Sequence, residues 1–402
     1  MRRLFYAAAL LGLAACGQTS LSPSTTTPSA ASPAGRPAPP TVIRAASFSS
    51  LLGWTADDPA QALPALKRSC ERLMRQNDDA AVGPNALGGR VRDWRDACGR
   101  IAALDRPTAA SMRQFLESSF RPWSVEDGSE GLFTGYYEPD LAGARRPGPG
   151  YLAPLYRRPP DLVMVELGEF RADYRGQRIA GRVVNGQLRP YASRAEIDAG
   201  ALAGRNLELL YLADPIDSFF LAIQGSGRIK LPDGTITRVG YDAQNGHAYF
   251  AIGRELVRRG IMPADQVSMQ SIRSWLAANP REAPAVMATN PSYIFFRELT
   301  GDGPIGSQGV VLTPGRSIAV DPTQAPMGAP IWLEAADASA MIGSFQRLMV
   351  AQDTGGAIRG AVRGDVFWGS GAEPGERAGV MKARGRWYFL LPVGVTPPSP
   401  VS

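Results

Sequence analysis

In the first third of the chain, hydrophobic residues recur at intervals of three and four positions, which is the spacing of an amphipathic helix. Residues 59–76 and 109–118 follow this spacing. We predict a helix over each, the second capped by Asp105 or Thr108, in a helical N-terminal part that covers residues 45–130. The predicted core positions are Leu63, Leu66, Leu73, Met112, Phe115 and Leu116.

From Gly131 onward, short apolar runs alternate with turns rich in proline and glycine, a pattern typical of β-strands. In residues 141 to about 240, which we interpret as a small all-β unit, residues 218–223 are one of these runs. Two helices are expected after this unit, one starting at His247 and one over residues 265–278.

The last part of the chain, residues 301–392, contains about six short apolar runs separated by turns. Strands at this spacing are typical of a small β-barrel. The runs lie within residues 310–333, 345–352, 361–368 and 387–391.

Composition supports a turn-rich globular chain, since 44 glycines and 34 prolines among 402 residues favour β structure over helix bundles. The formal charge is +6, and loss of Arg2 and Arg3 with a signal peptide would leave 6 − 2 = +4. That surplus favours an acidic, polymeric or membrane-associated partner. Because no dense basic run is present, nucleic acid is not an expected partner.

The N-terminus has the pattern of an export signal. Arg2 and Arg3 precede residues 4–13, which carry no charge but are too few to span a bilayer. Small residues follow, so we predict a signal peptide over residues 1–15.

Leu-Ala-Ala-Cys at residues 13–16 resembles the lipobox of bacterial lipoproteins, in which Cys16 would carry the lipid. An ordinary signal with an incidental cysteine is the alternative. By the same resemblance, Gly17 in place of a retention aspartate favours an outer-membrane lipoprotein that faces the periplasm. Residues 16–44, rich in Ser, Thr, Pro and Ala, are predicted to be a disordered tether.

Cys70 and Cys98 are the other two cysteines. An exported compartment permits a disulfide between the N-terminal helices, and two free buried thiols are the alternative. With no histidine nearby, these cysteines make a poor metal site, and we predict neither a metal nor a cofactor.

Candidate chemistry is concentrated in residues 350–369, V-A-Q-D-T-G-G-A-I-R-G-A-V-R-G-D-V-F-W-G. Asp353 and Asp365 lie in apolar surroundings, where an acid is costly to desolvate and is kept for pairing or for chemistry. Either the acids form a catalytic site for glycosidic cleavage, or they tie loops to Arg359 or Arg363.

Other catalytic classes fit poorly. Asp353-Thr-Gly resembles the active-site strand of aspartic proteases, but no second copy supplies the partner carboxylate. His247 is the only histidine, which disfavours a nucleophile triad and an imidazole metal cluster. The adjacent Tyr136 and Tyr137 could line a sugar groove or be one inward and one outward residue of a strand. The glycines at residues 225–227 suggest a close backbone approach to a ligand.

Five motifs occur together: G-L-F-T-G-Y-Y-E-P, A-I-Q-G-S-G, G-Y-D-A-Q-N-G-H-A-Y, N-P-S-Y-I-F-F, and A-V-D-P followed by Q-D-T-G-G-A-I-R-G and G-D-V-F-W-G. In this order they resemble the membrane-bound lytic murein transglycosylase A family over residues 131–391. The resemblance implies a mainly β fold with helices: a double-psi β-barrel domain completed by N-terminal helices, and a second small β-barrel domain inserted over residues 131–300. A glycan groove would lie between them, and residues 301–392 would be the three-aspartate domain.

The resemblance also implies roles. Asp365 would be the acid and then the base, Asp353 its support, and Asp321 the third aspartate of the domain. The substrate would be the β-1,4 bond between N-acetylmuramic acid and N-acetylglucosamine in peptidoglycan, cleaved without water to 1,6-anhydromuramyl ends. Candidate sugar contacts are Thr134, Tyr136, Tyr137, Gln224, Ser226 and Tyr241. The alternatives are a non-catalytic peptidoglycan-binding lipoprotein and a hydrolase acting at the same bond.

Cys16→Ser should release the protein from membranes, because the predicted lipid is attached to that cysteine. Fractionation of cells that express the wild type and the variant measures this. Continued sedimentation of the variant with membranes would refute the anchor.

Overall fold

The computed structural model describes residues 41–398, apart from residues 129, 175–176, 302 and 338. The predicted signal peptide, Cys16 and most of the predicted tether lie outside the described residues. The end of the predicted tether, residues 42–44, belongs instead to strand β1 (Val42–Ala45), which pairs with β2 (Phe120–Glu126). Its β-branched Val42 and Ile43 favour strand pairing over a solvated linker.

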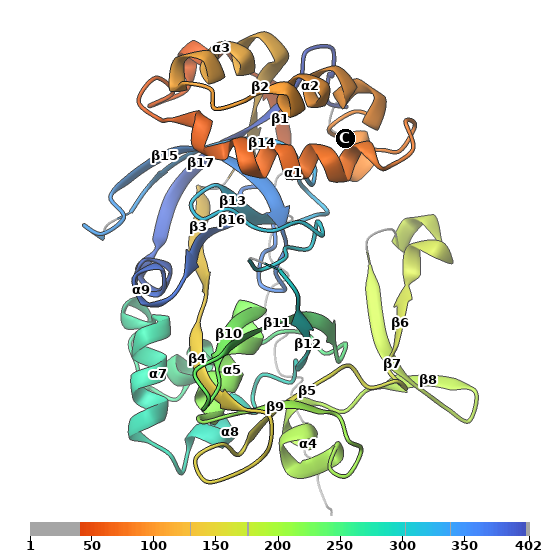
Figure 1. Ribbon diagram of the computed structural model, residues 1–402, viewed down its shortest axis with the longest axis vertical. Coiled ribbons are helices and arrows are strands. Elements are labelled where there is room, and N and C mark those ends of the chain that lie inside the picture. The colour runs from red at the N-terminus through yellow and green to blue at the C-terminus, as the bar shows by residue number, and fades with distance from the viewer. Residues whose placement is uncertain (1–40, 129, 175–176, 302, 338, 399–402) are drawn as a thin grey trace, which may run out of the picture. The chain divides into compact units, whose positions relative to one another are not determined.

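Six strands form a closed barrel in the order β3, β16, β13, β15, β14 and β17 (Figure 1). The ring closes because β17 pairs with β14 along one edge and with β3 along the other, where β2 also pairs. The strand bounds are β3 Gly131–Glu138, β13 Ser317–Val320, β14 Pro330–Ala336, β15 Ser344–Asp353, β16 Arg363–Ser370 and β17 Lys382–Pro392.

The barrel differs from the prediction in where its strands come from. We placed β3 in the inserted domain, but it closes the barrel by pairing with β16 and β17. The strand expected near residue 310 is only an isolated bridge between Ile305 and Val311, and helix α9 (Ala372–Val380) was not predicted. Thr134 of β3 lies 231 residues from its partner Asp365, and no local sequence pattern encodes a pairing over that separation.

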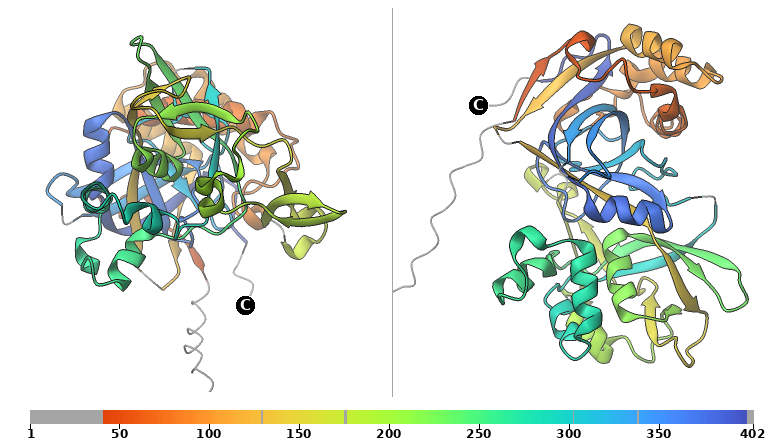
Figure 2. Two further views of the ribbon diagram at one scale, coloured as in Figure 1. Left: turned by 90° about the horizontal axis from the view of Figure 1, so that it is seen from below. Right: turned by 90° about the vertical axis from the view of Figure 1, so that its left-hand side faces the viewer.

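The predicted N-terminal helices are present as α1 (Leu63–Met74), α2 (Val91–Ala103) and α3 (Ala109–Ser119). They lie together against the barrel and share its hydrophobic core (Figures 1 and 2). Thr108 caps α3 by accepting a hydrogen bond from the backbone N–H of Ser111 at 3.1 Å. The predicted disulfide is confirmed, since Cys70 in α1 is bonded to Cys98 in α2.

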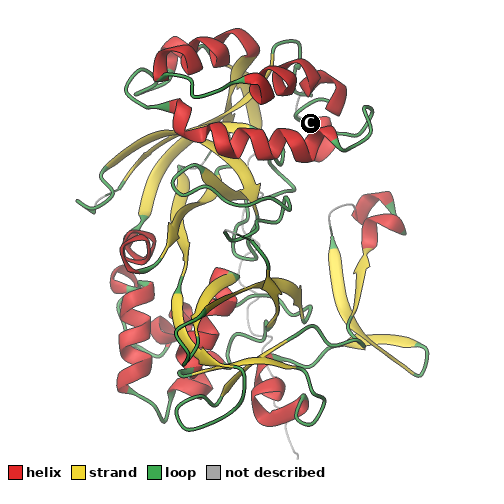
Figure 3. Cartoon of the chain, viewed as in Figure 1, coloured by secondary structure: helices red, strands yellow, loops and turns green. Residues whose placement is uncertain are grey.

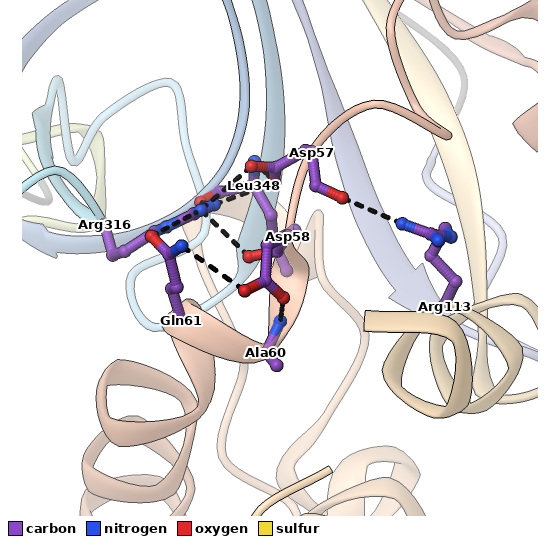
Figure 4. A network of polar contacts seen from close by, with 7 residues as sticks. All are labelled: Asp57, Asp58, Ala60, Gln61, Arg113, Arg316 and Leu348. Atoms are coloured by element: carbon purple, nitrogen blue, oxygen red, sulfur yellow. Dashed lines mark hydrogen bonds and ion pairs between the residues drawn. The ribbon is translucent and has the colours of Figure 1, made fainter. Parts of the chain in front are cut away.

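A buried ion pair fastens the segment before α1 to the barrel (Figure 4). Arg316 donates to both carboxylate oxygens of Asp57, each at 2.8 Å, and the backbone N–H of Leu348 donates to Asp57 Oδ2 at 3.0 Å. The two side chains are only 4% and 6% exposed. Removing either partner would leave a buried charge uncompensated, which is strongly destabilising.

After Pro139 the chain leaves the barrel and forms the inserted unit, residues 140–299 (Figure 3). Its main sheet has the order β12, β11, β10, β4, β9, β5, and a separate sheet of β6, β7 and β8 projects from it (Figure 1). The strands are β4 Asp140–Ala144, β5 Ala153–Tyr156, β6 Val163–Glu166, β7 Arg178–Val184, β8 Gln187–Pro190, β9 Glu208–Leu212, β10 Ser226–Lys230, β11 Ile236–Gln244 and β12 Ile294–Leu299.

The stretch predicted to be all-β, residues 141 to about 240, also contains helices α4 and α5, and three more helices follow it in the described part of the inserted unit. Their bounds are α4 Arg194–Glu196, α5 Pro215–Gln224, α6 Ile252–Arg258, α7 Met269–Ala278 and α8 Ala283–Met287. The helix expected from residue 265 is confirmed as α7. The helix expected from His247 begins only at Ile252, and the His247 ring instead lies 2.8 Å from the carbonyl oxygen of Tyr191.

Residues 218–223, interpreted as a strand run, lie in helix α5. Its ends explain the error: Asp214 accepts from the backbone N–H of Ile216 at 2.8 Å, Pro215 opens the first turn, and Gly225 closes the helix at φ +81°. The close approach expected at the following glycines is internal, because a Cβ on Gly227 would lie 2.6 Å from Leu221 Cδ1. Among the described residues, each helix is too short or too polar to cross a bilayer.

Replacing both Cys70 and Cys98 with alanine should lower the free energy of unfolding by about 2–4 kcal/mol, because the bridge closes a loop in the unfolded chain. Denaturant unfolding of the wild type and the double variant measures the loss. A reducing agent should destabilise the wild type and leave the double variant unchanged. Equal stability of the two oxidised proteins would contradict a stabilising role.

Candidate active site

Strand register brings both acids to one row across the barrel wall. Thr134 in β3 is opposite Asp365 in β16, Asp365 is opposite Ala319 in β13, and Ala319 is opposite Asp353 in β15. Residues opposite each other in neighbouring strands project from the same face of a sheet. The two carboxylates, twelve residues apart in the sequence, therefore flank one small alanine side chain.

Asp365 has one carboxylate oxygen bound and one available. Its Oδ1 accepts hydrogen bonds from Thr134 Oγ1 and from Arg363 Nη1, the latter at 2.5 Å. Arg363 Nη2 also donates to Thr134 Oγ1 at 2.9 Å, so three side chains close a triangle. No described residue donates a hydrogen bond to Asp365 Oδ2, and the side chain is 20% exposed. Asp365 can thus meet a ligand through Oδ2 while Oδ1 stays fixed.

Asp353 has both oxygens occupied. Its Oδ1 accepts from the backbone N–H groups of Ser307 at 2.8 Å and Thr354 at 2.9 Å, and its Oδ2 accepts from the Tyr136 hydroxyl at 2.8 Å. Burial raises the pKa of the Asp353 carboxyl, the three hydrogen bonds oppose this shift, and the charge of Asp365 adds to it. Burial and Asp353 together raise the pKa of Tyr136 well above its ordinary value. The two acids are thus close enough to interact.

A β-bulge sets the position of Asp353. The pairing of β13 with β15 shifts register between Ile318 and Ala319, so that Gln352 is the extra residue. The fully buried Gln352 amide accepts from Ser317 Oγ at 2.5 Å, and donates to the carbonyl of Ala65 and to Ser69 Oγ in α1. Bulges next to functional sites re-aim side chains, and here helix α1 holds the bulge in place.

Asp321, the third predicted acid, supports loops. It is buried and accepts hydrogen bonds from the Thr323 hydroxyl at 2.7 Å and from the backbone N–H of Gly360 at 2.9 Å. Gly360 lies in the segment that joins Asp353 to Asp365. Asp321 therefore fixes that segment and makes no direct contact with either acid.

The six predicted sugar contacts divide into three groups. Thr134 and Tyr136 touch the acids, as described above. The backbone N–H of Tyr137 donates to Gln224 Oε1 at 3.1 Å, which joins β3 to α5. Ser226 is buried in β10, and Tyr241 in β11 is 44% exposed; neither contacts an acid.

Three residues at or near the acids were not predicted as site residues. Arg363 was considered only as a loop tie, and Ser307 contributes through its backbone, which no side-chain pattern reveals. Tyr249, within the helix predicted to start at His247, has its Cβ only 3.8 Å from where a Cβ on Gly356 would lie. Burial raises the pKa of Tyr249, and the charge of Asp365 adds to the shift. Its place in the G-Y-D-A-Q-N-G-H-A-Y motif was the available signal.

Neither Asp353 nor Asp365 lines either of two cavities in the structure, which have volumes of about 390 and 320 Å³. Since Asp365 is partly exposed, solvent reaches it directly. In the described part of the chain, no group of three or more His, Cys, Asp or Glu residues could hold a metal ion.

The chain is similar to known proteins over most of its length. Residues 132–297 match the family model of the MltA specific insert domain, and residues 316–391 match that of the 3D domain. The chain is 32% identical over 306 residues to membrane-bound lytic murein transglycosylase A of Escherichia coli K12, covering 75% of this chain and 74% of that protein. The namesake from Vibrio cholerae is 36% identical over 204 residues, 49% of this chain and 55% of the relative.

Solved structures are similar over most of the chain. A membrane-bound lytic murein transglycosylase from Agrobacterium tumefaciens superposes with a TM-score of 0.79 at 36% identity, over 87% of this chain and 98% of that one. E. coli MltA with bound chitohexaose gives a TM-score of 0.62 at 27% identity, over 89% and 93%. The predicted fold class, mainly β with helices and with a barrel of the double-psi type, is confirmed.

A six-stranded barrel with paired acids and a large unit inserted after β3 defines an enzyme of the lytic murein transglycosylase class. The chain belongs to the membrane-bound lytic murein transglycosylase A family, as the resemblance of its motifs predicted.

In Asp353→Asn, the difference in melting temperature, variant minus wild type, should rise as the pH rises from about 4, the ordinary pKa of an aspartate, through the raised pKa of the folded protein. The folded pKa of Asp353 is raised, so its contribution to stability is present below the unfolded pKa and is lost as pH rises through the folded pKa. The variant has no proton to lose there. Calorimetric melting at several pH values measures the difference. Asp265→Asn, at an exposed carboxylate, is the control, and a difference that falls with rising pH would contradict the raised pKa.

Proposed function

We propose that this protein cleaves the β-1,4 bond between N-acetylmuramic acid and N-acetylglucosamine in peptidoglycan without water, giving 1,6-anhydromuramyl ends, with Asp365 as the single acid and base. The observation that carries the proposal is the asymmetry of Asp365, bound at Oδ1 by Thr134 and Arg363 and unpartnered at Oδ2 among the described residues.

In the first step, Asp365 donates a proton from Oδ2 to the glycosidic oxygen. The carboxylate that remains is stabilised by the Arg363 guanidinium and the Thr134 hydroxyl on Oδ1. The oxocarbenium-like muramyl centre is then attacked by its own C6 hydroxyl, whose proton returns to Asp365. An intramolecular nucleophile has a high effective concentration, so no enzyme nucleophile is needed.

The state of Asp353 favours this reaction over hydrolysis. A glycoside hydrolase generally uses a second carboxylate as the nucleophile or to activate water. Both oxygens of Asp353 already accept hydrogen bonds, from two backbone amides and from Tyr136. We therefore assign Asp353 a supporting role: it orients Tyr136, and its charge favours the positive charge that develops in the transition state. Asp321 supports the joining segment through Gly360.

The glycan strand is proposed to contact Thr134, Tyr136, Tyr137, Gln224, Ser226 and Tyr241. The chitohexaose bound to E. coli MltA, an oligosaccharide, supports a sugar polymer as ligand. The exposed ring of Tyr241 suits stacking on a sugar face. Lipid on Cys16 would hold the enzyme at the outer membrane, facing the periplasm, within reach of its substrate.

Asp365→Asn should reduce cleavage of purified sacculi by a factor of about 10² to 10⁴, because the amide cannot donate or accept the transferred proton. Mass analysis of the released fragments measures both the rate and the chemistry. Anhydro ends are expected from the wild type; reducing ends would indicate a hydrolase, and no fragments would indicate a binding protein.

Binding of the variant to sacculi should persist, since its fold and the other sugar contacts are retained. Asp265→Asn removes an exposed carboxylate outside the site and should keep full activity. Cleavage by Asp365→Asn at the rate of Asp265→Asn would exclude Asp365 as the acid.

A further inference from the structure

The projecting sheet of β6, β7 and β8 has one face made entirely of apolar residues. Residues that are opposite each other in paired strands, and alternate residues along one strand, project from the same side of a sheet. The register therefore sorts this sheet into two faces. One of them, which we call the apolar face, consists of Val163, Val165, Ile179, Gly181, Val183, Leu188 and Pro190. It has no side chain that can donate or accept a hydrogen bond.

The apolar face is open to solvent. Val183 is 58% exposed and Val163 is 38% exposed. Of the sixteen large hydrophobic residues that are exposed in the described part of the chain, seven lie between residues 163 and 188. The sheet projects from the inserted unit (Figures 1 and 3), and it packs on the core of that unit through its other face, with Met164 and Ala180. Exposed apolar side chains gathered in this way mark an interaction surface.

The other face carries two exposed arginines that form no ion pair with a described residue. Arg182 and Arg189 are directly opposite each other in β7 and β8, where like charges destabilise a sheet. Arg189 donates to the side-chain oxygen of Gln187 at 2.5 Å, whereas Arg182 makes no hydrogen bond with a described residue. Hydrogen bonds from Ser193 lower the pKa of Glu196, and the charge of Arg182 adds to this shift, but the two side chains form no ion pair. The two arginines therefore favour an anion as a further partner.

A lipid bilayer with anionic headgroups matches both faces at once. An apolar surface that lies on a bilayer enters the boundary between headgroups and acyl chains to a depth of about 5–10 Å. At that depth the backbone of the sheet lies among the headgroups, where the free N–H groups of the edge strands β6 and β8 stay hydrated. Long arginine side chains on the other face then lie at the level of the lipid phosphates and can bind them.

Other occupants of the apolar face match it less well. From the spacing of strands and the rise per residue, the face measures about 14 Å by about 17 Å, or about 240 Å², whereas each partner in a specific protein interface buries about 800 Å². The face is therefore too small to hold a second copy of this chain in a stable dimer. A glycan needs hydrogen-bond donors and acceptors, which the apolar face lacks.

We propose that the sheet of β6, β7 and β8 is a lipid-contacting surface. Its apolar face enters the acyl boundary of a bilayer that contains anionic phospholipid, and Arg182 and Arg189 bind the lipid phosphates. This contact is distinct from the predicted lipid on Cys16, and it is independent of glycan cleavage, because none of its residues contacts Asp353 or Asp365.

Sedimentation with lipid vesicles tests this surface. The parent chain is residues 16–402 with Cys16→Ser, which keeps every described residue and carries neither the predicted signal peptide nor the predicted lipid. We expect it to sediment with vesicles of phosphatidylethanolamine and phosphatidylglycerol at a lipid concentration about tenfold or more below that needed with phosphatidylcholine alone.

Val183→Gln in the parent chain should raise the lipid concentration for half-maximal binding about tenfold, because it places an amide in the acyl boundary. Val184→Gln is the matched control: it makes the same change at the next residue of β7, on the opposite face, and should bind like the parent chain. Replacing Arg182 and Arg189 together with glutamine should remove the preference for phosphatidylglycerol.

Absence of the parent chain from the pellet of phosphatidylglycerol vesicles, or equal binding by Val183→Gln and Val184→Gln, would overturn the proposal. A parent chain that elutes as a dimer, with a Val183→Gln chain that elutes as a monomer, would assign the face to a second copy instead. If Val183→Gln fails to fold, Leu188→Gln, at the opposite position in β8, takes its place with the same expectation. Sacculus cleavage by Val183→Gln should be unchanged, which separates failure of this proposal from failure of the proposed function.

Discussion

Parallel pairing of β3 with β16 is the constraint on which the rest of the structure depends. It places Thr134 opposite Asp365, and two residues further along β3 it brings the Tyr136 hydroxyl to Asp353. Parallel strands need a long connection. Here that connection includes the whole inserted unit and three other barrel strands, so the same pairing that builds the acid site also anchors both ends of the inserted unit to the barrel.

Local signals in the sequence predicted local structure well. The spacing of apolar residues predicted helices α1 and α3. The predicted export to a compartment that permits disulfides, together with the predicted N-terminal helices, led to the prediction of the bond between Cys70 and Cys98. Helix α5 was missed because its apolar run also suits a strand, and only its Asp-Pro start and glycine end distinguish the two. The place of β3 in the barrel was missed for another reason: it depends on partners more than 200 residues away, which no window of sequence contains.

In the candidate site, too, some residues could be predicted from the sequence and others depend on how distant strands pair. The acids and the threonine and tyrosine of β3 were identifiable, because their motifs occur together in one family. The contributions of Ser307 and Gln352 were not, since one acts through a backbone N–H and the other through a bulge that appears only when β13 and β15 pair. The role of Arg363 depends on the rotation of its strand, which places its guanidinium against Asp365 and Thr134 together. The residue types in the sequence predicted candidate site residues, and the register of the paired strands determined which of them contact one another.

The position of β17 has a consequence for how the chain is made. It is the last strand of the described residues, yet it pairs with β14, β2 and β3 and is required to close the ring. The barrel therefore cannot close while the chain is still being synthesised, whereas the main sheet of the inserted unit has all its strands by residue 299. A chain that ends before Lys382 would contain both acids and every residue that contacts them, but its barrel would stay open. The ring that keeps the two acids in register thus depends on the barrel strand that comes last in the chain order.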